Sequence, residues 1–149
     1  MNGTTGGRTM RGTASRGGLV LGLVLLASQA GAAIRYVDHQ TGSDAINSCL
    51  LPSNPCATIQ RAIDVAEDDD TIRFACDGVC AQSVLIEDSL TGVVLEGRWE
   101  PGFASRRPVS EPTRIRPRGG SARVIEVVAR FAVIDVAFDG FAIFGGSVA

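Results

Sequence analysis

The sequence contains no lysine and only one histidine, one tryptophan and one tyrosine among its 149 residues. All 14 basic residues are arginine, which points to coding bias rather than to a function. From Ala33 onward, 11 arginines stand against 16 acidic residues, a net charge of −5. A polyanion binds poorly to a chain without a basic excess, so this composition argues against a nucleic-acid partner.

The scarcity of histidine also limits the chemistry that the chain can perform. No nucleophile motif surrounds His39, so a Ser-His-Asp arrangement is unsupported and a surface histidine is expected. The cysteines do not show C-x-x-C spacing, and there is no second histidine to complete a zinc site. We therefore expect neither a metal site nor another cofactor.

Long hydrophobic runs are missing as well. The apolar run at residues 19–27 is shorter than the roughly 20 residues that a membrane-spanning helix needs. A stretch containing Arg8, Arg11 and Arg16 but no acid precedes it, and small residues follow it at 30–32. This layout predicts a signal peptide at 1–32 and an exported domain at 33–149, secreted or in the cell envelope. The alternative is an uncleaved signal that anchors the chain, and we expect no other membrane span.

The cysteines are the first feature of the exported part. Cys49, Cys56, Cys76 and Cys80 form two close pairs, and in an oxidising compartment such pairs indicate disulfides. Three connectivities are possible. We favour Cys49–Cys56 and Cys76–Cys80, because each pair flanks a segment rich in turn residues.

One short amphipathic helix is predicted at residues 58–66. Ile59, Ala62, Ile63 and Ala66 follow the i, i+3, i+4, i+7 pattern and form one apolar face. The four acids at 67–70 lack the spacing of a calcium loop and indicate a charged turn. No second helical pattern follows, so this helix is expected to cover the open end of a β-structure.

The rest of the chain reads as short strands separated by turns. Gly140 lies where the apolar alternation changes phase, which predicts a bulge or a bend between two successive strands. The expected strands are residues 33–37, 71–74, 83–87, 93–96, 113–116, 123–128 and 131–138.

An ordered series of short motifs runs from Ile34 to the end of the chain. Its members are Tyr36-Val37-Asp38, Thr41-Gly42-Ser43-Asp44, Cys49, Pro55-Cys56-Ala57-Thr58-Ile59-Gln60, Ala62-Ile63, Ala66, Asp70-Thr71-Ile72, Val94-Leu95-Glu96-Gly97-Arg98-Trp99, Phe103, Ser105-Arg106, Pro112-Thr113, Phe138-Asp139-Gly140-Phe141-Ala142-Ile143 and Gly145-Gly146. In this order, the chain resembles the secreted right-handed parallel β-helix proteins, whose fold is shared with pectate lyases.

The resemblance implies an all-β fold, a right-handed parallel β-helix solenoid whose N-terminal end is capped by the predicted α-helix. Asp69 and Arg98 stand where the family usually has glycine, and an aspartate can adopt a left-handed backbone at some cost. The chain would hold the cap and two or three coils, so the solenoid is C-terminally incomplete. Because a repeat array needs about three units and a terminal cap, we expect a fragment that is truncated or marginally stable alone.

Two functions are compatible with this resemblance. The preferred one is a non-catalytic cell-surface or secreted module for adhesion, binding or structure, with an extracellular glycan or a cell-surface component as partner. The alternative is a pectate-lyase-like polysaccharide lyase that acts on acidic glycans with Ca²⁺. For that activity Asp135 and Asp139 are the candidate catalytic residues, although acids that alternate with apolar residues are typical of a solvated strand face.

Candidate binding residues are Arg114, Arg116 and Trp99. The two arginines belong to a basic stretch that could bind an acidic glycan, and prolines interrupt it as in a solvated loop. The indole of Trp99 could stack on a sugar or pack at the base of a loop.

Overall fold

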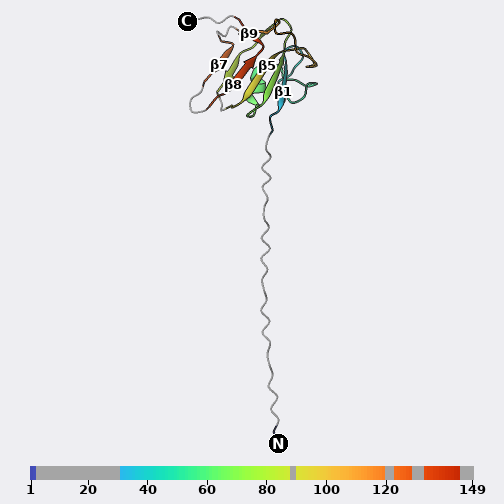
Figure 1. Cartoon of the computed structure of the whole chain (residues 1–149), viewed down its shortest axis with the longest axis vertical. Coiled ribbons are helices and arrows are strands. Elements are labelled where there is room, and N and C mark those ends of the chain that lie inside the picture. The colour runs from blue at the N-terminus through green and yellow to red at the C-terminus, as the bar shows by residue number, and fades with distance from the viewer. Residues whose placement is uncertain (3–30, 88–89, 120–122, 129–132, 145–149) are drawn as a thin grey trace.

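The structure is a computed structural model, and it describes residues 1–2, 31–87, 90–119, 123–128 and 133–144. The expected signal peptide, residues 1–32, lies almost entirely outside these residues. Nowhere in the described ranges is a helix both long and apolar enough to pass through a membrane. Figure 1 shows the strands side by side.

The described part of the chain is mostly β-structure, which agrees with the predicted all-β class. Its elements are β1 (Ile34–Asp38), α1 (Ile59–Asp64), β2 (Thr71–Ala75), β3 (Val79–Ala81), β4 (Val84–Ile86), β5 (Val93–Trp99), β6 (Thr113–Arg116), β7 (Ile125–Val127), β8 (Val136–Asp139) and β9 (Phe141–Ile143). The expected strands at 33–37, 71–74, 93–96 and 113–116 correspond to β1, β2, β5 and β6.

These strands form three sheets, and all pairing between them is parallel. The strand orders are β1-β2-β5-β8, β3-β6-β9 and β4-β7. From β2 onward, each strand therefore pairs with the strand whose number is three higher, as β2 does with β5, β3 with β6 and β4 with β7. Parallel neighbours cannot be joined by a tight hairpin, and here the chain visits the other two sheets before it returns.

Inward-facing side chains stack in register from strand to strand. In the first sheet Ile72 pairs with Leu95 and Leu95 with Phe138, while in the second sheet Ile115 pairs with Ile143. Ile72, Leu95 and Ile115 are buried, but Phe138 is 37% and Ile143 53% exposed. Exposure rises at β8 and β9 because, among the described residues, they are the last strands of their sheets.

The segment around Gly140 behaves as predicted. Gly140 has a φ of 78° and separates β8 from β9, which belong to different sheets. The predicted bend is therefore confirmed. The expected strand at 131–138 is shorter than predicted, since β8 starts at Val136, and residues 131–132 lie outside the described part. The short strand β3 was not predicted.

Helix α1 buries the predicted face. Ile59, Ala62 and Ile63 are buried, and the Thr58 hydroxyl caps the helix by accepting a hydrogen bond from the Arg61 N–H at 3.1 Å. The helix packs against β1, β2 and β4. It is shorter than the predicted 58–66 because its regular hydrogen bonding ends at Asp64.

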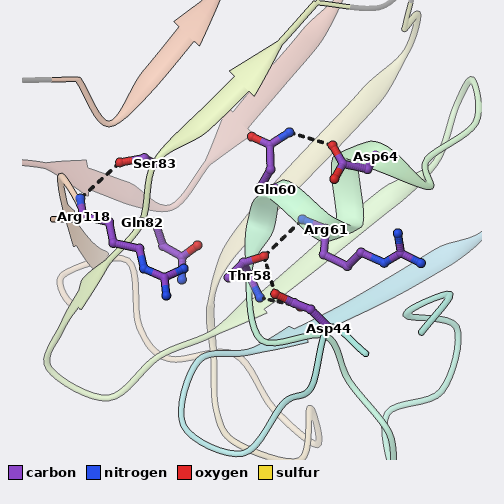
Figure 2. Close-up of a pocket in the computed structure, with 8 residues that line it drawn as sticks. All are labelled: Asp44, Thr58, Gln60, Arg61, Asp64, Gln82, Ser83 and Arg118. Carbon is purple, nitrogen blue, oxygen red and sulfur yellow. Dashed lines mark hydrogen bonds between the residues drawn. The ribbon is translucent and has the colours of Figure 1, made fainter. Parts of the chain in front are cut away.

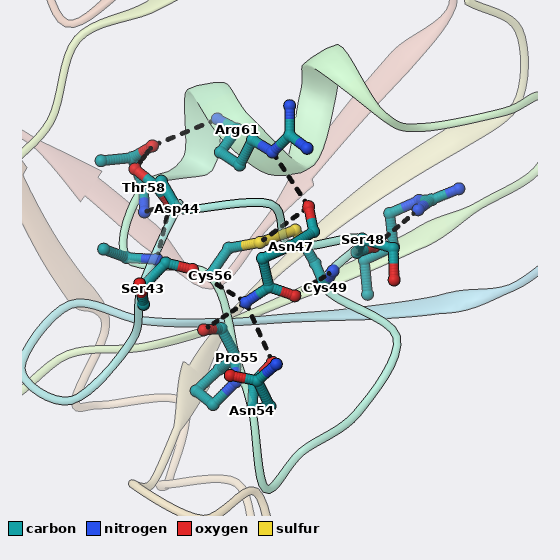
Figure 3. Close-up of a disulfide and its surroundings, with 12 residues drawn as sticks. Ser43, Asp44, Asn47, Ser48, Cys49, Asn54, Pro55, Cys56, Thr58 and Arg61 are labelled. Atoms are coloured by element: carbon teal, nitrogen blue, oxygen red, sulfur yellow. Dashed lines mark hydrogen bonds between the residues drawn. A yellow bond between two sulfur atoms is a disulfide. The ribbon is translucent and has the colours of Figure 1, made fainter.

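The Cys49–Cys56 disulfide closes a loop along the free edge of β1 (Figure 3). Tyr36 N–H donates to the Cys49 carbonyl at 2.7 Å, and Cys56 N–H donates to the Tyr36 carbonyl at 2.9 Å. Because an unpaired strand edge invites association, this loop protects the N-terminal edge of the first sheet. The second disulfide joins Cys76 to Cys80, so both bonds match the favoured pairing.

Asn47 organises the disulfide loop from inside. Its side-chain nitrogen donates to the carbonyls of Ser43, Asn54 and Pro55 at 2.8, 3.1 and 2.9 Å. Its side-chain oxygen accepts from Cys49 N–H at 2.9 Å. The Arg61 Nε donates to the Asn47 backbone carbonyl at 2.9 Å, and this bond ties the loop to α1 (Figure 3).

The acidic turn at 67–70 holds a buried ion pair that the sequence did not predict. Arg35 Nε donates to Asp70 Oδ2 at 2.6 Å, and the two side chains are only 6% and 1% exposed. Asp70 also accepts from the backbone N–H groups of Ala33 and Glu67 at 2.7 and 2.9 Å. Asp70 is therefore an anchor between β1 and β2. The predicted turn between the helix and the next strand is present, and its last acid is buried in an ion pair.

Five non-glycine residues of the described part have a positive φ, and the two that stand where glycine was expected, Asp69 and Arg98, are among them; the others are Ile46, Cys49 and Phe103. Asp69 has a φ of 65° and Arg98 a φ of 67°. Asp69 thus has the left-handed backbone that an aspartate can adopt at this position. A side chain in this conformation costs about 1–2 kcal/mol, so both positions carry local strain.

Candidate functional site

Two of the predicted site residues, Trp99 and Asp139, come together on the outer face of the first sheet. Arg73 on β2 is in register with Glu96 on β5, and Glu96 is in register with Asp139 on β8. Neighbouring strands lie about 4.8 Å apart, so these side chains are adjacent. We call Arg73, Glu96, Trp99, Arg98, Arg106 and Asp139 the charged ladder.

Ion pairs connect the charges of this ladder. Arg73 Nε lies 3.4 Å from Glu96 Oε2. Arg106 bridges both acids, with Nη1 at 3.8 Å from Glu96 Oε1 and Nη2 at 2.9 Å from Asp139 Oδ2. Arg98 Nη2 lies 3.8 Å from Asp139 Oδ1. The carboxylates are thus neutralised by the chain's own arginines.

The indole of Trp99 is engaged by the same ladder. Its Nε1 donates to Glu96 Oε2 at 3.1 Å. The guanidinium carbon of Arg73 lies over the ring at 4.3 Å, and that of Arg106 lies at 5.8 Å. Cation–π contacts of this kind favour the folded arrangement, so a sugar stacking on this ring would have to displace an arginine.

The other predicted acid, Asp135, does not join Asp139. Asp135 precedes β8, and its backbone N–H donates to the Leu90 carbonyl at 2.8 Å. Four residues of extended chain separate the two Cα atoms by about 13 Å. The geometry therefore does not favour one shared calcium ion. Across the described residues, no group of three or more His, Cys, Asp or Glu side chains could hold a metal ion.

The predicted binding residues Arg114 and Arg116 lie on β6, and both side chains are exposed. Thr113 and Ile115 alternate with them and are buried. The Arg114 guanidinium carbon lies 5.4 Å from the Phe144 ring. The basic stretch is thus part of a regular strand here, and not only a solvated loop. Trp99 and Asp139 lie on a different sheet from these arginines.

A polar pocket of about 360 Å³ lies between α1 and the segments around residues 82–83 and 118 (Figure 2). Asp44 is one of its walls, but both of its oxygens are engaged at the start of the helix. Oδ1 accepts from the N–H groups of Ala57 and Thr58 at 2.8 and 3.1 Å, and Oδ2 accepts from the Thr58 hydroxyl at 2.8 Å.

Two glutamines on the pocket wall fasten α1 to the sheets. Gln60 accepts from Leu85 N–H at 2.6 Å and donates to the Leu85 carbonyl at 3.0 Å, so its amide pairs with β4 as a neighbouring strand would. The buried Gln82 accepts from Ile59 N–H at 3.1 Å. The polar groups of this pocket therefore serve mainly to dock the helix.

His39 contributes to the same docking. Its Nδ1 lies 3.0 Å from Gln82 Nε2. Because the Gln82 oxygen already accepts from Ile59, the amide nitrogen is the group that faces the ring, and Nδ1 accepts. His39 is half-buried and hydrogen-bonded to Gln82, so it keeps part of its surface in solvent while it supports the helix.

Sequence reasoning missed the residues that hold the cap together, namely Asn47, Gln60, Gln82, Arg35 and Asp70. Gln60 and Asp70 belong to the motif series without a role having been assigned to them, and the signal for the others was the presence of amides and charges among apolar residues near the predicted helix. Comparisons with protein-family models, curated proteins and solved structures give no match for this chain.

Proposed function

We propose that the chain is a secreted or cell-surface module built as a right-handed parallel β-helix, with a binding, adhesive or structural role and no catalytic one. The order of strand pairing supports the architecture. A chain that winds repeatedly through three sheets pairs each strand with the one a full coil later, and the three observed sheets follow that rule from β2 onward. Crossovers between parallel strands are right-handed in nearly all proteins.

The capped N-terminal end supports the same proposal. The disulfide loop lies along β1, Gln60 pairs with the edge of β4, and α1 packs between them. A stack of parallel strands needs such a cap, because its end otherwise presents unpaired backbone groups and apolar surface. Disulfides are typical of exported proteins, so the two buried bonds are in keeping with secretion.

One observation carries the non-catalytic role. Arg106 bridges Glu96 and Asp139, so both carboxylates of the charged ladder are held in ion pairs. A carboxylate that acts as a base or binds calcium must have a free lone pair facing the substrate. The ladder instead resembles a surface ion-pair network that stiffens the sheet.

The alternative is a pectate-lyase-like polysaccharide lyase that uses Ca²⁺ on an acidic glycan, and one observation favours it. Asp139 is 55% exposed and has two arginines beside it, the combination of carboxylate and guanidinium that lyase chemistry uses. On this alternative Arg98 or Arg106 would abstract the proton next to the uronate carboxyl group.

The two proposals are separated by incubating the full chain with polygalacturonate and Ca²⁺ and following the absorbance of the unsaturated product. We expect no turnover above buffer. Steady product formation that disappears in Asp139→Ala but persists in Asp135→Ala would establish the lyase and overturn the non-catalytic role. Retention on an immobilised extracellular glycan without turnover would support binding.

A further inference from the structure

A second cavity, of about 250 Å³, lies on the outer side of the second sheet. Residues from the turn before β3, from the 107–112 segment and from β6 surround it: Gly78, Arg107, Ser110, Glu111, Pro112 and Arg114. It is separate from the charged ladder and from the pocket beside α1. We propose that this cavity binds an oxyanion group, a carboxylate or a sulfate carried by a ligand, between Arg107 and Arg114.

Arg107 is the main support for this inference. Its side chain is half-buried, and Nη2 donates to the Cys76 carbonyl at 2.7 Å. Its backbone N–H donates to the Arg98 carbonyl at 2.7 Å, which fixes the start of the segment. The Nε group is buried and has no hydrogen-bond partner. The bond to Cys76 therefore holds the guanidinium in place at the cavity wall, while the Nε group itself is closed off from solvent.

The charge of Arg107 is also uncompensated. In the part of the chain that the structure describes, no carboxylate forms an ion pair with Arg107 or with Arg114. Withdrawing a cation from water without a counter-ion is unfavourable, and an anion in the cavity would relieve that cost. By contrast, Arg73, Arg98 and Arg106 all have acidic partners.

The other walls fit an oxyanion. Arg114 extends from β6 as a second cation, and the Ser110 hydroxyl supplies a neutral donor. A Cβ built on Gly78 would meet no atom within 4 Å, so the space on that side is open. Glu111 is the only acid among the lining residues, which leaves the cavity with a net charge of one positive unit. One bound anionic group would balance it.

The inference goes beyond the proposed function and holds whether or not the chain turns over a substrate. It is tested by titrating the ¹⁵N-labelled full chain with sodium sulfate against sodium chloride at equal ionic strength and recording amide and arginine Nε signals. We expect saturable shifts at Gly78 and Ser110 and at the Arg107 Nε. Arg114→Met should weaken sulfate binding roughly tenfold, because a charge-assisted hydrogen bond is lost.

Arg116→Met is the matched control. Arg116 lies two residues further along β6, is equally exposed and does not line the cavity, so its loss should leave the affinity unchanged. Glu111→Gln should tighten binding several-fold, since a repelling charge is removed. Arg107→Met should abolish binding, and if this variant fails to fold, the Arg114 and Arg116 pair still decides the question.

Two results would overturn the inference: no saturable shift near the cavity, or an equal effect of Arg114→Met and Arg116→Met. A parallel titration with sodium acetate distinguishes the source of the group. Tighter binding of sulfate points to a sulfated ligand, and tighter binding of acetate points to a carboxylated one.

Discussion

The buried pair of Arg35 and Asp70 makes the strongest prediction about what holds this cap together. Asp70→Ala removes the carboxylate that accepts from Arg35 Nε at 2.6 Å and from the backbone N–H groups of Ala33 and Glu67. Arg35 would stay buried at 5% exposure without a counter-ion. Breaking one side of a buried ion pair costs about 3–5 kcal/mol.

That cost is large for a domain whose total stability is about 5–15 kcal/mol. We therefore expect Asp70→Ala to lose about a fifth or more of the free energy of unfolding. The measurement is urea denaturation followed by circular dichroism, with the slope of the transition checked for a change in cooperativity. Thermal unfolding should show a drop of roughly 10 °C or more, in line with the usual few degrees per kcal/mol.

The matched control is Glu96→Gln. Glu96 pairs with Arg73 at 3.4 Å, but both side chains keep about a quarter of their surface in water, at 23% and 26% exposed. A pair of this kind contributes less than about 1 kcal/mol. The double variant Arg35→Met/Asp70→Leu should recover much of the loss, because it leaves no unpaired charge. If Asp70→Ala costs no more than Glu96→Gln, the pair is solvated and the reasoning is refuted.

Three further perturbations follow from the cap, the strained turn and the exposed end. Replacing Cys49 and Cys56 with alanine should cost about 2.5 kcal/mol in urea denaturation, because an eight-residue closed loop opens in the unfolded chain; an unchanged midpoint would contradict this. Asp69→Gly should raise the unfolding free energy by about 0.5–1 kcal/mol through relief of its left-handed backbone, whereas Asp77→Gly, without a positive φ, should lower it. Phe138→Lys should reduce self-association in sedimentation velocity, since a charge at an exposed strand edge opposes pairing; equal association would argue against edge pairing.

The local pattern of the chain was enough to predict much of the fold. The apolar spacing of Ile59, Ala62 and Ile63 identified the buried face of α1, and the phase change at Gly140 identified the bend between β8 and β9. The disulfide pairing also followed from short-range spacing. These features depend on residues close in sequence, where geometry restricts the outcome.

The polar contacts that hold the cap were not predictable in the same way. Arg35 meets Asp70 across 35 residues, and Gln82 meets His39 across 43. The motif Asp70-Thr71-Ile72 sets Asp70 apart from the three acids before it, but nothing near it in the sequence indicates Arg35 as its partner. Only the placement of one strand beside another decides which of the four is buried.

The candidate site was also only partly predictable, because its residues come together from distant parts of the chain. Trp99 and Asp139 were singled out separately, and the structure joins them through Arg106, which comes from a loop after β5. The spacing of Asp135 and Asp139 suggested a pair, but an extended chain keeps residues four apart well separated. The sequence around Arg107 gave no indication of the cavity that this residue lines, because residues from three separate segments form it.

The unequal ends of the strand stack limit how copies of this protein can assemble. The described strands β7, β8 and β9 present their free edges, while the disulfide loop and α1 cover the edges of β1 and β4. In the first and third sheets, the open edges among the described strands thus lie at β8 and β7, so a further strand that pairs with either sheet has one direction in which to add.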